Sequence, residues 1–122
     1  METGVLPVEL DIRASDGVAV VEPKGRIDSV TAKVFGDRVC ALVRAGENRV
    51  VIDLANVAYM SSAGFRSLLI VGKMVEQTAG RLALCGVVGE VKRLFEIGGF
   101  NELFVICPTR AESVAKVGPA SP

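Results

Sequence analysis

Histidine is the residue whose absence excludes most, because none of the 122 residues is a histidine. Histidine is the usual general base near neutral pH and the commonest protein ligand of zinc. Catalysis by a Ser-His-Asp triad, by a Cys-His pair or by an HExxH zinc site is therefore excluded. We expect no metal site and no bound cofactor.

An excess of charge of one sign is also lacking, because 14 Lys and Arg residues balance 14 Asp and Glu residues. Binding to nucleic acid or to anionic lipid usually relies on a basic field, so neither is expected. A glycine-rich phosphate loop is missing too, since the segments 86–89 and 98–99 match neither GxxxxGK[ST] nor GxGxxG. Nucleotide hydrolysis is not indicated.

The chain has only three cysteines, Cys40, Cys85 and Cys107, and they form no CxxC pair. An odd number of widely spaced thiols suits a reducing compartment, and we interpret all three as core residues.

No stretch approaches the ~18–20 uninterrupted apolar residues of a membrane span. The N-terminus has no basic region followed by an apolar run. These features predict a cytoplasmic protein without membrane insertion.

Apolar residues, in contrast, are plentiful and make up 50% of the chain. A chain of this length can bury roughly two thirds of its unfolded surface in one core. We expect a single domain over residues 1–117, with a loose start at 1–4 and a frayed C-terminal tail at 118–122. The mean hydropathy of +0.44 is high for a small protein, which leaves apolar surface for a partner.

The hydrophobic pattern alternates between strand and helix periods along the chain. Strands are predicted at 8–13 and 18–22, joined by the turn at 15–17 and ended by residues 23–25, and further strands at 49–54, 81–85 and 103–107. Helices are predicted from Val30 to about 46, from the serine pair at 61–62 to about 78–80, over 89–97, and from Thr109 to 117. The order β-β-α-β-α-β-α-β-α predicts an α/β fold, with a mainly parallel sheet that opens with a β-hairpin and four helices packed on it.

Two loops of this fold follow the carboxyl ends of strands, where ligands and switches gather in parallel sheets. They span residues 23–29 and 58–65, and strand order should bring them together. Ser62 would lie at the start of the second helix, beside backbone N–H groups without intrahelical acceptors. A phosphate there would be stabilised by the helix dipole, yet its charge of about −2 would repel a packed partner. From residue types alone, Ser61 and Ser62 are better explained as ordinary N-caps, worth about 1 kcal/mol, than as a functional site.

Asp28 and Asp53 are the carboxylates best placed for catalysis, because Asp53 ends a buried strand and Asp28 lies in the first loop. No second acid converges on either residue in the sequence pattern, so we favour a role in bracing loops by hydrogen bonds. Gly64 and Gly72 are interpreted as packing residues, which let the second helix approach its neighbours closely.

Three segments in this order resemble the STAS family, and within it the stand-alone anti-sigma factor antagonists of bacteria. They are GRID at 25–28, VVIDLANVAYMSSAG at 50–64 and EVKRLFEIGGF at 90–100. The resemblance implies a STAS-like fold and a regulator that is not an enzyme. It also implies phosphorylation of the serine that opens the second helix, here Ser62, by an anti-sigma factor that is itself a serine kinase. The unphosphorylated form would bind this kinase, and a metal-dependent serine phosphatase would reset the switch.

The chain departs from the family pattern on both sides of Ser62. Ser61 stands where an aspartate often precedes the acceptor, and Ala63 where a second Ser or Thr often follows, so Ser61 is an alternative acceptor. Two other functions stay open: a non-switching STAS subunit of a transport or signalling complex, and an enzyme that uses Asp28 and Asp53. The predicted partner-binding face comprises Gly25, Arg26, Asp28, Met60, Ser61, Ser62, Ala63, Gly64 and Phe65.

Overall fold

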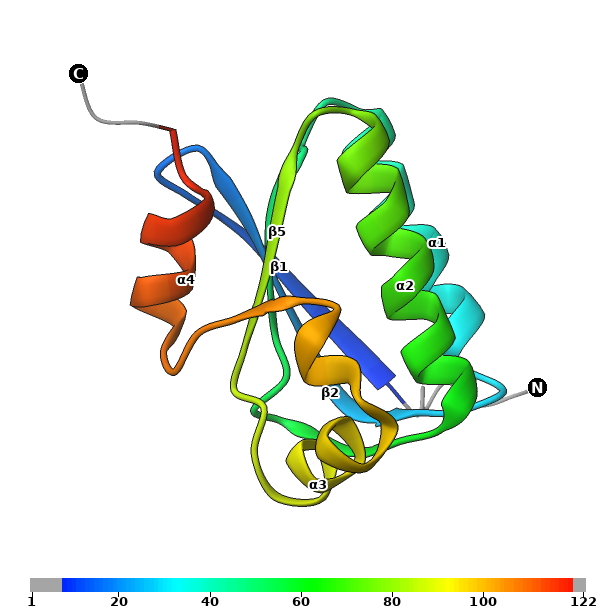
Figure 1. The fold of residues 1–122 in the computed structure, drawn as a ribbon. Coiled ribbons are helices and arrows are strands. Elements are labelled where there is room, and N and C mark those ends of the chain that lie inside the picture. The colour runs from blue at the N-terminus through cyan, green and yellow to red at the C-terminus, as the bar shows by residue number, and fades with distance from the viewer. Residues whose placement is uncertain (1–7, 120–122) are drawn as a thin grey trace.

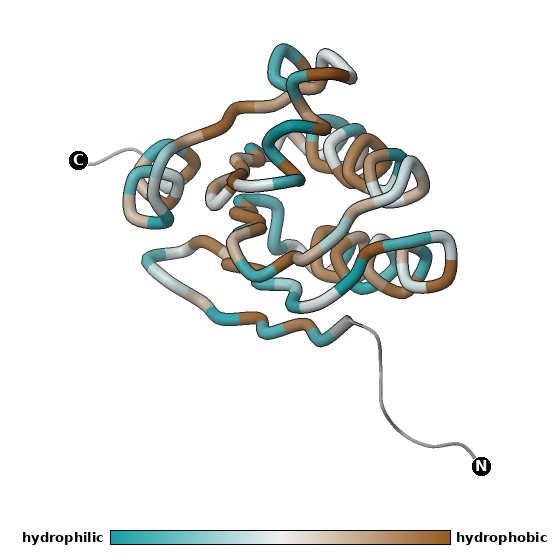
Figure 2. Tube along the Cα trace, turned by 90° about the horizontal axis from the view of Figure 1, so that it is seen from below, coloured by the Kyte–Doolittle hydropathy of each residue, from teal (hydrophilic) through white to brown (hydrophobic). Residues whose placement is uncertain are grey.

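The computed structural model describes residues 8–119, which form one mixed sheet with helices against it (Figure 1). Strands β1 (Val8–Ser15) and β2 (Val18–Ile27) make the antiparallel hairpin that the sequence predicts. Only Asp16 and Gly17 connect them, with φ angles of 52° and 78°. Asp-Gly tolerates this left-handed backbone, which matches the twist of a two-residue hairpin. Figure 2 shows β1 alternating between hydrophobic and hydrophilic residues.

The remaining strands are parallel to β2. Strands β3 (Arg49–Asp53), β5 (Arg81–Cys85) and β6 (Val105–Ile106) extend the sheet in the order β1-β2-β3-β5-β6. Strand β4 (Val57–Met60) leaves this order and pairs with the end of β2. The mainly parallel sheet is thereby confirmed, and β3 lies at its centre, as its apolar composition predicts.

Helices cover both faces of the sheet (Figure 1). Helices α1 (Ala32–Arg44) and α2 (Ser62–Gln77) lie on one face, and α4 (Arg110–Val117) lies on the other. Helix α3 (Gly89–Gly98) ends at Gly99, whose φ of 73° is a left-handed cap typical of glycine, and the short η1 (Phe100–Glu102) follows. The four predicted helices are thus confirmed.

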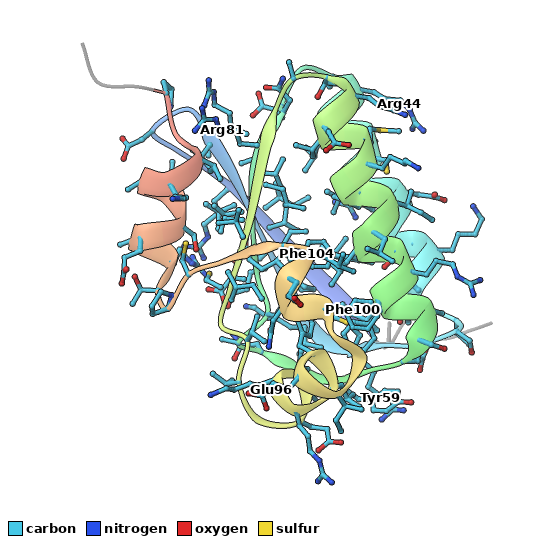
Figure 3. All side chains as sticks on the ribbon, in the orientation of Figure 1. Arg44, Tyr59, Arg81, Glu96, Phe100 and Phe104 are labelled. Atoms are coloured by element: carbon cyan, nitrogen blue, oxygen red, sulfur yellow. The ribbon has the colours of Figure 1, made fainter. Side chains whose placement is uncertain are left out.

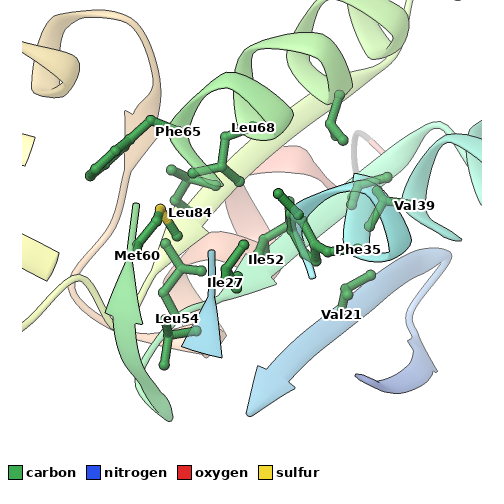
Figure 4. Packing of buried hydrophobic residues seen from close by; sticks show 14 of the residues in the cluster. Val21, Ile27, Phe35, Val39, Ile52, Leu54, Met60, Phe65, Leu68 and Leu84 are labelled. Carbon is green, nitrogen blue, oxygen red and sulfur yellow. The ribbon is translucent and has the colours of Figure 1, made fainter. Parts of the chain in front are cut away.

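The main hydrophobic core lies between the sheet and helices α1 and α2 (Figure 4). It includes Phe35, Ile52, Leu68 and Leu84, each with 0% exposure. A smaller cluster faces α4 and uses the alternate residues of the same strands, because successive strand side chains point to opposite faces. Its buried members are Val18, Val20, Val51, Ala83, Cys85 and Val117.

Several boundaries differ from the predicted ones. Residues 23–25 do not end the second strand, because β2 continues to Ile27. Pro23 lies where β2 has finished pairing with β3, at Val21, and before it pairs with β4, at Gly25. A missing N–H there interrupts neither parallel ladder. Strand β4 was not predicted at all, and the last strand is confined to 105–106 because η1 and a turn take up the preceding residues.

The first helix begins later than predicted, at Ala32 instead of Val30. Val34 is apolar and lies in the first turn of this helix, yet it is 51% exposed. Cys40 and Cys85 are buried as predicted, whereas Cys107 is only partly buried. Gly118 is not frayed, because its N–H donates to the Val114 carbonyl at 2.9 Å. The predicted ends 1–4 and 120–122 lie outside the described residues.

Candidate functional site

The two loops singled out in the sequence meet at the end of β2. Parallel pairing places Ile27 beside Met60, and the Ser61 N–H donates to the Ile27 carbonyl at 2.9 Å. The Gly25 N–H donates to the Asn56 carbonyl at 3.0 Å, where the register shifts between Gly25 and Arg26. The expected juxtaposition is therefore confirmed, and β4 is the strand that produces it.

The two serines at the start of α2 have different environments. Ser61 is the N-cap, with extended backbone, and its Oγ accepts from the Gly64 N–H at 3.4 Å. Ser62 is the first residue of the helix and is exposed. Within residues 8–119, the Ser62 hydroxyl makes no hydrogen bond to another group. Of the two serines, Ser61 is therefore the capping residue, and Ser62 is the exposed one.

Asp28 organises the neighbouring loop. Its carboxylate accepts from the N–H groups of Val30 at 3.0 Å and Thr31 at 3.2 Å. Donation by these two groups lowers the pKa of the Asp28 carboxyl, and the Arg26 charge acts in the same direction. This turn delays the start of α1, so the predicted bracing role of Asp28 is confirmed.

Thr31 closes the same turn and was not recognised in the sequence. Its Oγ1 donates to the Arg26 carbonyl at 2.7 Å and accepts from the Asp28 N–H at 2.9 Å. The spacing of Asp28 and Thr31, three residues apart, is a turn pattern that could have indicated it. Thr31 is 3% exposed, so it fixes the loop from the inside.

Three residues of the predicted partner-binding face are buried. Met60 is 1% exposed and Phe65 is 6% exposed, and Gly64 is also buried. The Phe65 ring stacks on Phe100 with centroids 4.4 Å apart. These three residues support the face from beneath and do not form its surface. The members at the surface or partly exposed are Gly25, Arg26, Asp28, Ser61, Ser62 and Ala63.

Tyr59 adds an aromatic group that the sequence analysis missed (Figure 3). Strand pairing places it beside Arg26, whose guanidinium carbon lies 4.4 Å from the ring centroid. Such a cation–π contact contributes about 0.5–1 kcal/mol at exposed sites. Arg26 also pairs with Asp28, whose Oδ2 is 3.6 Å from Arg26 Nε. A cation, an aromatic ring and a carboxylate thus adjoin the loop of Ser62.

Asp53 does not belong to this site. One of its carboxylate oxygens accepts from the Ala55 N–H at 3.0 Å, and the other accepts two bonds from Arg110 at 3.0 and 2.9 Å. Arg110 also pairs with Glu22 at 3.1 Å. Asp53 therefore braces the chain after β3 and ties α4 to the sheet, as the sequence analysis favoured.

Thiol and metal chemistry find little support in the described part of the chain. Burial raises the pKa of the Cys85 thiol to about 11 and also raises that of Cys40. Within residues 8–119, no group of three His, Cys, Asp or Glu side chains could hold a metal ion. None of the described helices is long and apolar enough to cross a membrane.

Comparison with known proteins identifies the family. A model of the STAS domain matches residues 9–113, so the chain belongs to the STAS domain family. BtrV of Bordetella bronchiseptica, described as an anti-sigma factor antagonist, is 35% identical over 115 residues, which cover 94% of this chain and 99% of BtrV.

Solved structures agree with this family. The crystal structure of an anti-sigma factor antagonist from Mycobacterium paratuberculosis has a TM-score of 0.82 at 25% identity, over 90% of this chain and 93% of that chain. The phosphorylated form of the Bacillus cell fate determinant SpoIIAA has a TM-score of 0.69 at 16% identity, over 89% of this chain and 99% of that chain. This second likeness shows the fold alone.

Proposed function

We propose that this protein is an anti-sigma factor antagonist, which binds an anti-sigma factor through the end of β2 and the start of α2. Phosphorylation of Ser62 releases this partner. The observation that carries the proposal is the environment of Ser62, an exposed hydroxyl without a partner among the described residues at the first position of α2. The description of BtrV as an antagonist supports the same class of function.

The acceptor is Ser62 and not Ser61. The Ser61 oxygen lies against the Gly64 N–H, and the Ser61 N–H is held by the Ile27 carbonyl. An aspartate at position 61 would cap the helix in the same way, since both residue types are favoured N-caps. The departure at position 61 thus keeps the capping function, and the free hydroxyl stays at position 62.

The phosphate would act mainly through its charge. When the Ser62 oxygen attacks the terminal phosphorus of ATP, a new O–P bond forms, the bond to ADP breaks, and the hydroxyl proton passes to a base of the kinase. The first turn of α2 contains no acidic residue, so its dipole and free N–H groups stabilise the phosphate. A charge of about −2 then lies on the surface that the partner contacts when Ser62 is unphosphorylated, and the partner is repelled.

Four further parts complete the proposal: the partner, the phosphatase, the absence of a catalytic role and the location. The binding partner is a serine kinase that consumes ATP, and a metal-dependent serine phosphatase restores the hydroxyl. The existence of SpoIIAA in a phosphorylated form supports a covalent switch within this fold. The protein itself has no catalytic role and works in the cytoplasm, where ATP is present and free thiols persist.

The test is a quantitative pull-down from lysate of the source cells with Ser62→Ala and Ser62→Asp, followed by mass spectrometry. We expect the alanine variant to retain a kinase-type anti-sigma factor, and the aspartate variant to retain at least about tenfold less, because the added charge opposes packing. The captured kinase with ATP should phosphorylate the wild type and Ser61→Ala, but not Ser62→Ala.

Equal capture of one complex by both variants contradicts the switch. If that complex is a transporter or a larger signalling assembly, the protein is a non-switching STAS subunit and Ser62 is only a helix residue. Phosphate on Ser61 in the kinase assay would move the acceptor by one residue and contradict the assignment to Ser62.

A further inference from the structure

A second surface lies along α2, on the side that faces β6 and away from the Ser62 loop. Nine large apolar side chains are exposed among the described residues, and four of them line a single groove here. Leu69 and Ile70 come from α2, with exposures of 40% and 53%. Leu103 and Val105 come from the segment around β6, with exposures of 59% and 44%. Concentration of exposed apolar groups at one place is typical of an interaction site.

The groove has a volume of about 660 Å³ and a floor that belongs to the core. Phe104, labelled in Figure 3, lines it and packs on Phe95 with centroids 6.2 Å apart. Gly72 also lines the groove, and a Cβ placed there would be in ordinary contact with Leu82 and Phe104, both at 3.7 Å. The groove is thus lined by apolar side chains, and its floor is formed by residues that pack on the core.

Cations stand on the helical wall of the groove. Arg66 and Lys73 both line it, and neither forms an ion pair within residues 8–119. They are seven residues apart, about 10 Å along a helix at ~1.5 Å per residue. Glu76 is the one acid in the lining, beyond Lys73 toward the end of α2. The part of the groove next to Leu69 and Ile70 therefore carries positive charge.

We propose that this groove binds an amphipathic α-helix of a partner protein, with acidic residues beside its apolar face. The helical wall from Arg66 to Glu76 extends over about 15 Å, which matches roughly three helical turns. An added strand fits less well, because β6 offers only Val105 and Ile106 as a pairing edge. A second copy of the chain in two-fold contact fits less well, because each copy contributes two cations and only one acid from the groove lining, so their charges would not balance.

The proposal is independent of phosphorylation at Ser62, so its test uses the unphosphorylated chain of 122 residues. Two synthetic peptides of about 15 residues, each helix-forming, serve as probes. Both peptides have the same apolar face. Beside this face, the first peptide carries two glutamates that are two turns apart, and the second carries lysines at the same two positions. Titration of each into the isotope-labelled protein, followed by amide NMR shifts, gives the affinity and the binding site.

We expect the glutamate peptide to bind at least about tenfold more tightly than the lysine peptide, because two attractions become two repulsions. The largest shifts should fall on Leu69, Ile70, Leu103 and Val105. Ile70→Ser should weaken binding, whereas Val88→Ser should not, since Val88 is similarly exposed at 56% but lies outside the groove. Lys73→Glu should reduce the preference for the glutamate peptide.

Equal affinities for the two peptides, shifts centred elsewhere, or binding unaffected by Ile70→Ser would overturn the proposal. Concentration-dependent dimerisation in sedimentation that Ile70→Ser abolishes would also overturn it, because the occupant would then be a second copy. Circular dichroism of each variant confirms that the fold is kept, which is expected because these side chains are exposed.

Discussion

At the scale of single residues, Gly64 is the position where α2 comes nearest to the end of β2. A Cβ built on Gly64 would lie 2.5 Å from the Cγ of Met60 and 2.9 Å from the carbonyl oxygen of Ile27. The same carbonyl accepts the Ser61 N–H, so it has no room to move away. Gly64 thereby sets the distance between the two loops of the candidate site.

Gly64→Ala should therefore destabilise the protein by about 1–3 kcal/mol, as overpacking of a core does. The measurement is the free energy of unfolding from urea titration followed by circular dichroism. Gly72→Ala is the matched control in the same helix, because its Cβ would make ordinary contacts at 3.7 Å. That variant should be neutral or gain up to ~1 kcal/mol from helix propensity. Equal losses in both variants would contradict a close approach specific to Gly64.

The sequence predicts which residue types make up the site better than it predicts where their side chains point. A serine pair before an apolar run indicates a helix start, but either serine can be the cap, and only the geometry assigns this role to Ser61. The sequence assigns Met60 and Phe65 to the binding face only because they adjoin the serine pair in the chain. Their burial depends on packing against Gly64, Phe95 and Phe100, which no local pattern encodes.

At the scale of secondary-structure elements, the sequence predicts the long periodic ones and misses the short one. Strand β4 is the four-residue apolar run Val57–Met60, in which Ala58 and Tyr59 are exposed, so it is short and lacks the alternation that identifies a half-buried strand. Strand β4 forms by pairing with the end of β2. The sequence does not indicate this pairing, because Pro23 suggests that β2 ends before it. The proximity of the two loops was nevertheless predictable, because it follows from the order of the parallel strands.

Helix α4 is attached to the sheet by an arginine from β3. One terminal nitrogen of Arg49 donates to the carbonyls of Val117 at 2.7 Å and Gly118 at 3.1 Å. Arg49→Met should cost about 1–3 kcal/mol, since these charge-assisted bonds satisfy carbonyls at the end of the helix. The substitution should accelerate amide hydrogen exchange in α4 by a larger factor than in α2.

Arg81→Met is the control for that experiment, because Arg81 pairs with Arg49 in register but has an exposed side chain. We expect its free energy of unfolding to change by less than about 0.5 kcal/mol, as at most exposed positions. Uniform acceleration of exchange over the whole Arg49→Met chain would argue against a local attachment of α4.

At the scale of the whole molecule, the two hydrophobic clusters share their strands. Val21 and Ile52 face helices α1 and α2, whereas their neighbours Val20 and Val51 face α4. Loss of either cluster removes the support of the other, so unfolding should be a single cooperative transition. Urea curves from circular dichroism and from methyl NMR signals of Val117 should have the same midpoint. An earlier loss of the Val117 signal would show that α4 unfolds separately.

The position of Tyr59 has a practical consequence for work on this protein. The chain has one tyrosine, no tryptophan and five phenylalanines, so fluorescence excited at the long-wavelength edge of tyrosine absorption, which phenylalanine does not share, comes from a single ring. That ring belongs to β4, the strand that ends just before the serine pair, and the Arg26 guanidinium lies over it. Binding at this end of the sheet should change the surroundings of the tyrosine, whereas binding in the groove beside β6 should leave them unchanged, because Tyr59 does not line that groove. The molecule therefore carries an intrinsic optical reporter that distinguishes its two candidate interaction surfaces without a label.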